Sequence, residues 1–179
     1  MKFIPFYLFL LALGLGACSQ SVEVDNPSTQ VLKFNIGENK IELEPGETKS
    51  ISVSKGQQVI EIKDAQDSLW LQTTASIQEE GLIAPPGNWY LIWTDLYGDQ
   101  TDRKSILSEK EIVLDSIKYS IDVLFVDSIG GFLPKKWDYS LIQSFPETLP
   151  LRGDQKSEKK SKIFKIENFK EAYEKRVHR

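Results

Sequence analysis

Histidine and cysteine are almost absent from this chain. The sequence holds one histidine, His178, and one cysteine, Cys18. A Ser-His-Asp or Cys-His arrangement needs an imidazole that packing and a hydrogen-bond partner hold in place. Zinc sites are built largely from His and Cys side chains. We therefore predict a protein that is not an enzyme, with no catalytic residue, no metal site and no cofactor.

An excess of positive charge is also lacking. The chain has 22 Lys and Arg residues against 26 Asp and Glu residues, for a formal net charge of −4. Nucleic-acid-binding proteins carry extensive basic surfaces, so we predict no nucleic-acid partner. Positive charge gathers only in residues 151–179, which hold ten basic and five acidic residues.

Long apolar runs are missing except at the start of the sequence. Lys2 precedes a charge-free apolar run over residues 3–16, and the small residues Gly16 and Ala17 lead to Cys18. This order is typical of a secretory signal peptide. A transmembrane helix needs about 20 consecutive apolar residues, and this run is shorter. A short N-terminal membrane anchor is the alternative interpretation.

The four residues Leu15-Gly16-Ala17-Cys18 resemble the lipobox of bacterial lipoproteins. The resemblance implies cleavage between Ala17 and Cys18, a diacylglycerol on the Cys18 sulfur and acylation of the new amino terminus. Two or three acyl chains together hold a protein durably at a membrane. Lipidation would also remove the free thiol that a single cysteine leaves in an exported chain.

This resemblance places the chain in the bacterial cell envelope, with the membrane as a partner through lipid on Cys18. Ser19, rather than Asp, follows the modified cysteine. In the sorting rule of such lipoproteins, Asp at that position retains the protein at the inner membrane. Ser19 therefore favours the outer membrane.

Short segments of alternating apolar and polar residues make up most of the remaining chain. Residues 31–36 and 117–125 alternate clearly, and turn sequences such as Glu44-Pro45-Gly46-Glu47 separate such segments. The pattern predicts an all-β fold, an antiparallel immunoglobulin-like β-sandwich with a short C-terminal helix. Residues 43–62 resemble the small immunoglobulin-like or PEGA-type modules of bacterial envelope proteins.

We predict four segments along the chain. They are a signal peptide over 1–17, a lipidated tether over 18–30, a β-sandwich domain over 31–150, and a basic linker with a short helix over 151–179. In the tether, Val22 and Val24 are candidates for a first short strand.

The basic segment has three interpretations. Residues 152–161 read as a flexible linker, and Asn168 is suited to cap a helix that carries Phe169 and Tyr173 on one face. The segment is either a solvated extension, a contact with anionic lipid headgroups, or a helix that docks on the acidic domain or on a partner.

Carboxylates provide two alternative chemistries. Asp95, Asp99 and Asp102 lie in one expected loop and are candidate Ca²⁺ ligands, although their spacing differs from that of an EF-hand and loops are commonly rich in Asp. A glycosidase-type acid and base pair could come from four other residues. These are Asp115, Asp122, Asp127 and Asp138.

Aromatic residues supply the candidate binding site. Trp89, Tyr90 and Trp93 are expected to fill the sandwich core because aromatic residues favour strands. Trp137 and Tyr139 lie in an irregular, proline-flanked stretch and are the candidate exposed ligand-binding residues, suited to stack on a sugar ring or a peptide.

The leading functional hypothesis is a membrane-anchored envelope lipoprotein that acts as a non-enzymatic binding or assembly component, with an unknown envelope protein as partner. A glycan-binding module that uses exposed aromatic residues is the alternative. A carboxylate-based hydrolase is the third hypothesis, and it requires two carboxylates that converge in one cleft.

Overall fold

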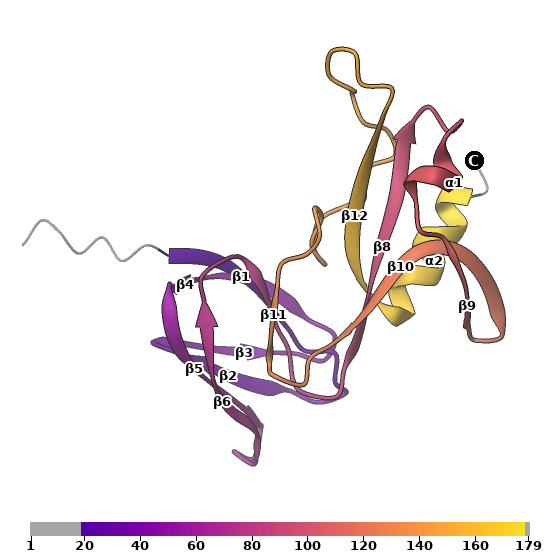
Figure 1. The fold of residues 1–179 in the computed structure, drawn as a ribbon. Coiled ribbons are helices and arrows are strands. Elements are labelled where there is room, and N and C mark those ends of the chain that lie inside the picture. Colours follow the sequence, from indigo (N-terminus) through magenta and orange to yellow (C-terminus); the bar gives the residue numbers. More distant parts are fainter. Residues whose placement is uncertain (1–18, 178–179) are drawn as a thin grey trace, which may run out of the picture.

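The computed structural model describes residues 19–177 and has an all-β, sandwich-like fold with a short C-terminal helix, as predicted (Figure 1). The strands are β1 (Ser19–Asp25), β2 (Leu32–Ile36), β3 (Asn39–Leu43), β4 (Thr48–Ser54), β5 (Gly56–Asp64), β6 (Leu69–Ile77), β7 (Gly81–Ile83), β8 (Trp89–Gly98), β9 (Lys110–Leu114), β10 (Ile117–Asp127), β11 (Phe132–Pro134) and β12 (Ser157–Lys165). The helices are α1 (Arg103–Ile106) and α2 (Ile166–Val177). Within residues 19–177, no helix is long and apolar enough to cross a membrane.

Two four-stranded sheets form the sandwich. One has the strand order β11-β7-β1-β4 and the other β3-β2-β5-β6. Alternation directs one face of each sheet inward, so that Leu32, Phe34 and Ile36 of β2 are fully buried while the residues between them are half-buried. These side chains join Val22 and Val24 of β1 in a single apolar core.

The turn between β3 and β4 has the expected chemistry. Gly46 adopts a φ of 76°, and the Glu47 amide donates to the Glu44 carbonyl at 3.0 Å. Pro45 presets φ at the preceding position, and glycine tolerates the positive φ that a type II turn demands. This turn sets the direction of β4 and thus its pairing with β1.

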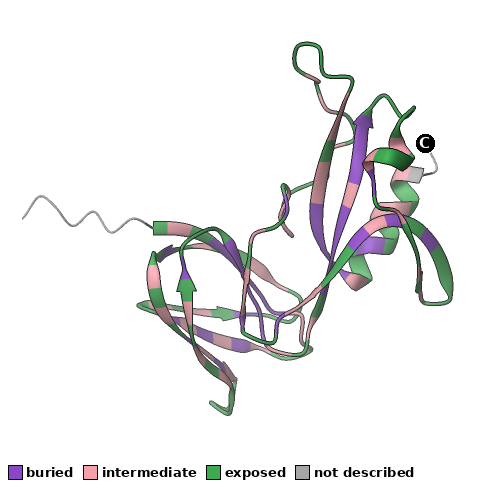
Figure 2. Cartoon of the chain, in the orientation of Figure 1, coloured by how far each residue is buried: buried purple, intermediate pink, exposed green. Residues whose placement is uncertain are grey.

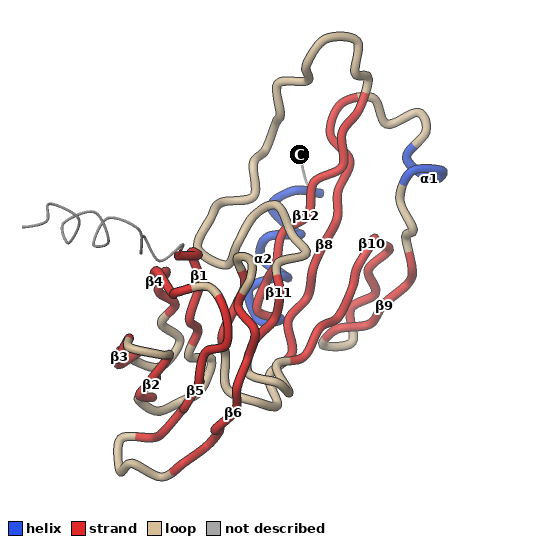
Figure 3. The backbone as a smooth tube through the Cα atoms, turned by 60° about the vertical axis from the view of Figure 1, so that its left-hand side comes forward, coloured by secondary structure: helices blue, strands red, loops and turns tan. Residues whose placement is uncertain are grey.

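A second unit consists of the sheet β12-β8-β10-β9 with α2 on one of its faces (Figure 3). In β8, Leu91 and Trp93 face the helix, whereas Tyr90 and Ile92 face the other way. Phe169 of α2 is fully buried against the helix-facing side. Figure 2 shows that buried segments run along the sandwich strands, β8 and one side of α2.

A third apolar cluster joins the two units. It contains Leu82 of β7, Tyr90 and Ile92 of β8, Trp137, and Ile163 of β12. The same junction holds a completely buried carboxylate, because Asp25 at the end of β1 accepts hydrogen bonds from three directions. Its donors are Thr48 Oγ1 at 2.5 Å, Tyr90 Oη at 2.8 Å and Lys165 Nζ at 2.7 Å.

The basic C-terminal segment differs from the expected linker. Residues 157–165 form β12, which pairs with β8 from Ser157 opposite Gly98 to Lys165 opposite Tyr90. The first six residues of this strand are all polar, so the sequence showed no alternation there and predicted a linker. The neighbouring strand β8 supplies the hydrogen-bond partners of its backbone. The helix begins at Ile166, so Asn168 lies within its first turn and does not cap it as expected. Phe169 and Tyr173 share one face, as expected, and this face packs against the core of the second unit.

The expected tether also differs from the structure. Residues 19–25 form β1, which is paired with β4 along its whole length, so Val22 and Val24 are core residues. The signal peptide over 1–17, the cleavage site at Ala17, the lipidation site Cys18, and His178 lie outside the described residues.

Candidate functional site

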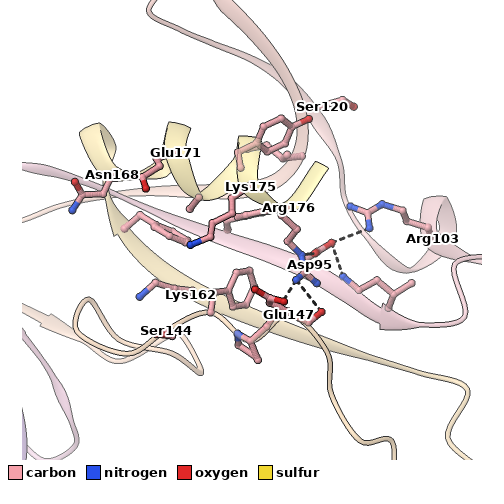
Figure 4. A pocket seen from close by; sticks show the side chains of 18 of the residues that line it. Asp95, Arg103, Ser120, Ser144, Glu147, Lys162, Asn168, Glu171, Lys175 and Arg176 are labelled. Atoms are coloured by element: carbon pink, nitrogen blue, oxygen red, sulfur yellow. Dashed lines mark hydrogen bonds and ion pairs between the residues drawn. The ribbon is translucent and has the colours of Figure 1, made fainter. Parts of the chain in front are cut away.

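A cavity of about 830 Å³ opens between α2, strands β8 and β12, and the loop 144–147 (Figure 4). Pockets that bind small molecules commonly have volumes of about 300 to 1,000 Å³. The side chains that line it combine aromatic rings, charged groups and small polar groups, and we take this cavity as the candidate functional site.

Aromatic rings form the inner wall of the cavity. Trp93 lies 5.4 Å from the Phe145 ring and 5.7 Å from the Tyr173 ring, measured between centroids. Phe164 lies 6.2 Å from both Trp93 and Phe145. Ring pairs at these separations attract one another beyond simple burial. The wall therefore combines residues from β8, β12, α2 and the 144–147 loop.

Trp93 also carries an unusual polar atom. Its Nε1 is buried and has no hydrogen-bond partner among the described residues. Phe145 and Phe169 contact this indole in edge-to-face arrangements, with interplanar angles of 68° and 88°. A buried N–H without an acceptor costs free energy. A ligand that places an oxygen acceptor or the face of an aromatic ring beside Nε1 would therefore be stabilised at this part of the wall.

A cluster of paired charges forms one side of the cavity. Asp95, only 4% exposed, accepts a hydrogen bond from Arg103 Nη1 at 2.8 Å and another from Arg176 Nε. Arg103 is also bonded to Glu109 at 2.7 Å. Burial alone would lower the pKa of Arg103, but these carboxylates outweigh it and raise the pKa. Arg103 is therefore protonated, and each guanidinium group of the cluster has a carboxylate oxygen within hydrogen-bond distance.

Arg176 connects this cluster to the aromatic wall. Its guanidinium carbon lies 4.4 Å from the centre of the Tyr97 ring and 5.3 Å from that of Phe145, which are cation–π distances. It also donates to the Pro146 carbonyl at 3.0 Å, and the Tyr97 hydroxyl donates to the same oxygen at 2.5 Å. Burial raises the pKa of Tyr97, so its hydroxyl remains a donor.

Lys162 lies on another side of the cavity and is 93% buried, with only 7% of its surface exposed. Its Nζ donates to the carbonyl oxygens of Ser140, Leu141 and Gln143, the last at 2.5 Å. Burial lowers the pKa of Lys162 to about 8, and the nearby Glu23 partly opposes this effect. All three protons of the ammonium group are used, so Lys162 holds the 140–143 loop against the sheet.

The structure does not bring the two predicted aromatic residues together on an exposed surface. Trp137 is only 6% exposed and packs in the cluster that joins the two units, so the expectation that its ring faces solvent was wrong. Tyr139 is half-buried, with its ring 5.8 Å from that of Phe145. The irregular stretch is pinned to β12, because the amides of Asp138 and Tyr139 both donate to the Ser161 carbonyl at 3.0 Å.

The aromatic residues of β8 divide between core and surface. Tyr90 and Trp93 are 1% and 2% exposed, which confirms their expected place in a core. Trp89 is 54% exposed, contrary to expectation. It is the first residue of β8 and pairs with Asp127 at the last position of β10, where neither unit covers its ring.

Four of the aspartates considered as ligands or catalytic carboxylates are engaged at different places in the structure. Asp95 is a β8 residue, whereas Asp99 caps the next turn by accepting from the Thr101 amide at 2.8 Å. Asp138 accepts from the Ser161 amide at 2.8 Å, and Asp122 from the Ser108 amide at 3.0 Å. Within residues 19–177, no three His, Cys, Asp or Glu side chains are grouped so as to hold a metal ion.

The sequence did not predict four residues of the site, which are Phe145, Lys162, Arg103 and Arg176. Arg176 could have been predicted, because it follows Phe169 and Tyr173 at the three- and four-residue spacing of one helix face. The other three reach the cavity from a loop, a strand and a short helix that only the tertiary structure brings together.

The fold and the cavity together define an all-β, sandwich-like protein with a cavity beneath its C-terminal helix. Comparisons with protein-family models, with curated proteins and with solved structures found no match.

Proposed function

We propose that this protein is a bacterial envelope lipoprotein that is held at a membrane by lipid on Cys18 and acts as a non-enzymatic binding component. The lipobox-like sequence that ends at Cys18 supports the anchor. The observation that carries the binding role is the cavity of about 830 Å³ beneath α2, with its aromatic wall and charged side.

The charged groups at the cavity support binding rather than catalysis. Asp95 is bonded to Arg103 and Arg176, and Lys162 donates to backbone carbonyls. A general base or a nucleophile must reach a reacting atom, whereas these groups are engaged in holding loops and α2 in place.

The cavity is lined by aromatic rings on one side and by charged side chains elsewhere, and this combination indicates the class of ligand. An apolar or aromatic body would contact Trp93, Phe164 and Tyr173, and a polar end would lie near the charged side chains Lys175 and Glu171. We therefore propose a small amphipathic molecule, or an amphipathic side-chain group of a partner protein, as the occupant.

Titration with the amphipathic dye 1-anilinonaphthalene-8-sulfonate tests this site. Ala172 lines the cavity and is half-buried, so Ala172→Trp should fill part of the space and weaken saturable dye binding about tenfold or more. Glu174→Trp adds the same side chain at an exposed position of the same helix, and it should leave dye affinity unchanged. Equal affinities in the two variants, or no saturable binding to the native protein, would contradict the proposal.

The anchor has its own test. Cells that express the chain would be fed an alkyne analogue of palmitate, and the purified protein would be examined for the label and for its density on a membrane gradient. We expect label on the native chain, none on Cys18→Ala, and sedimentation with the outer membrane, which Ser19 favours. An unlabelled native chain would refute lipid anchoring.

The glycan-binding alternative loses its main support. It depended on an exposed aromatic pair, and Trp137 is buried in the junction between the units.

A further inference from the structure

The sandwich begins without any spacer after Cys18. β1 starts at Ser19, and its pairing with β4 begins at once, with Ser19 opposite Ser54. Three residues later Val22 is completely buried in the sandwich core. Because Ser19 is already in register with Ser54, a single peptide bond separates Cys18 from the paired strand.

Covalent geometry then limits how far the lipid can be from the domain. Consecutive Cα atoms lie about 3.8 Å apart, whereas a ten-residue flexible linker would span about 17 Å on average. If Cys18 carries acyl chains, its backbone lies at the membrane surface. Ser19 and its neighbour Ser54 must then lie close to the same surface.

We propose that the sandwich is seated end-on, directly on phospholipid headgroups, through the end that carries Ser19. This inference rests on the proposed lipidation of Cys18. The seated end comprises Ser19, the β4–β5 turn at 54–56 and the β6–β7 turn at 78–80. The two turns belong to the same end because Gly56 is paired with Ile77, and Gln20 lines one surface hollow with Gln78 and Lys136.

The chemistry of this end suits headgroups rather than acyl chains. Ser19, Ser54, Lys55, Gln78 and Lys136 are all exposed and polar. The turn at 78–80 also carries the exposed Glu79 and Glu80, and Glu80 is paired with Lys135. Hydroxyl, amide and ammonium groups bind phosphate and glycerol oxygens, and a Lys near an anionic leaflet adds about 1 kcal/mol of attraction. This end therefore contacts the surface of the bilayer without inserting into it.

The opposite end of the sandwich serves as an internal reference. β5 runs from Gly56 to Asp64 and leads into a turn that contains the exposed Gln66. At about 3.3 Å per residue, the nine residues of β5 extend for about 30 Å. End-on seating therefore places Lys55 at the headgroups and Gln66 well away from them.

Site-directed labelling measures this difference. Cys18 is the only cysteine, and its thioether would not react with a maleimide, so Lys55→Cys and Gln66→Cys can each carry one fluorophore. The lipidated full-length chains would be reconstituted in vesicles of phosphatidylethanolamine and phosphatidylglycerol that contain a lipid with a nitroxide on its headgroup. We expect quenching several-fold stronger at position 55 than at 66. A ten-residue Gly-Ser insertion after Ser19 should weaken quenching at position 55 and reduce that difference.

Flotation of the vesicles separates the two proposals. Chains that float, but show equally weak quenching at both positions, overturn direct seating while lipid anchoring stands. Equally strong quenching at both positions shows a sandwich lying on its side and overturns end-on seating. Chains that do not float refute lipid anchoring itself, and the seating with it.

Discussion

Two buried aspartates organise this molecule at the residue scale. Asp25 is fully buried and bonded to Lys165, Tyr90 and Thr48, and Asp95 lies between Arg103 and Arg176. Removing one partner of a buried ion pair leaves an uncompensated charge, which costs more than the pair itself contributes. Each aspartate therefore fixes the position of chain segments that lie far away in the sequence.

Asp95→Asn tests the cluster beside the cavity. The substitution leaves two arginines facing a neutral amide. We expect the free energy of unfolding to fall by about 2 to 3 kcal/mol, which is less than for a fully buried pair because both arginines are partly exposed. Urea unfolding measures the loss. Glu111→Gln removes an exposed partner of Lys118 and should cost less than about 0.5 kcal/mol. Equal losses of stability in the two variants would contradict a stabilising role of the Asp95 cluster.

Lys162 gives the protein a specific dependence on pH. Its pKa in the folded protein is about 8, below the ordinary value of 10.5, because burial disfavours the charged form. Between these two pH values the unfolded chain binds more protons, so this lysine makes the free energy of unfolding rise with pH by up to about 1.4 kcal/mol per unit. Below pH 8 both states are protonated, and the contribution to the slope vanishes.

Lys162→Met removes this titration. Across pH 8 to 10.5, the unfolding free energy of the variant should rise less steeply than that of the native protein, as measured by urea unfolding at several pH values. Lys159→Met, at an exposed position of the same strand, serves as the control and should keep the native slope. Parallel pH profiles for native protein and Lys162→Met would refute the burial effect.

At the scale of elements, regular alternation distinguished the predictable strands from the others. Residues 31–36 and 117–125 alternate apolar and polar side chains. The structure has strand β2 over 32–36 and strand β10 over all of 117–125. β12 begins with the polar run 157–162 and was read in part as a linker. Its pairing with β8 supplies backbone partners that no local pattern encodes.

The helix α2 shows a similar division. Its apolar spacing predicted that Phe169 and Tyr173 share a face, which the structure confirms. Phe169 lies 5.6 Å from the ring of Trp93 and 5.3 Å from that of Tyr119. The sequence left open whether this face covers the domain or a partner. The structure shows that it covers the sheet β12-β8-β10-β9.

Phe169→Ala tests that contact. Removing a fully buried phenyl ring leaves a void beneath the helix, and such truncations cost about 3 to 5 kcal/mol. Lys170→Ala, at the exposed neighbouring position, should stay within about 0.5 kcal/mol of the native protein. Urea unfolding followed by tryptophan fluorescence reports both changes, and similar stabilities for the two variants would show that α2 is only loosely attached.

At the scale of the whole molecule, the sandwich and the sheet-helix unit meet at one buried junction. Lys165 at the end of β12 reaches Asp25 of the sandwich and also donates to the Gly46 carbonyl at 2.9 Å. Trp137 and Ile163 add apolar contact at the same place. The two units should therefore unfold together.

Asp25→Asn should uncouple them. The variant leaves Lys165 buried without its carboxylate, at a cost of about 3 kcal/mol, and we expect the single calorimetric transition of the native protein to separate into two. In the double variant Asp25→Asn/Lys165→Met the loss should be less than the sum of the single losses, because the unpaired charge is gone. A single transition and additive losses would contradict this role.

The features that the sequence predicted correctly depend on residues close to one another in the chain. The all-β class, the Pro-Gly turn at 45–46 and the shared face of Phe169 and Tyr173 all follow from the spacing of neighbouring residues. The lipobox-like end at Cys18 is local as well, and its lipidation stays a prediction.

The tertiary structure decided everything that depends on distant segments meeting. It buried Trp137, exposed Trp89 and joined Phe145, Lys162 and Arg176 around one cavity. Burial and ion pairing depend on contacts between residues that lie tens of positions apart in the sequence. The two-residue period of strands and the 3.6-residue period of helices describe only neighbouring residues, so they do not predict such contacts. It also placed Ser19 within a strand, which turns an expected tether into a proposed point of contact with the membrane.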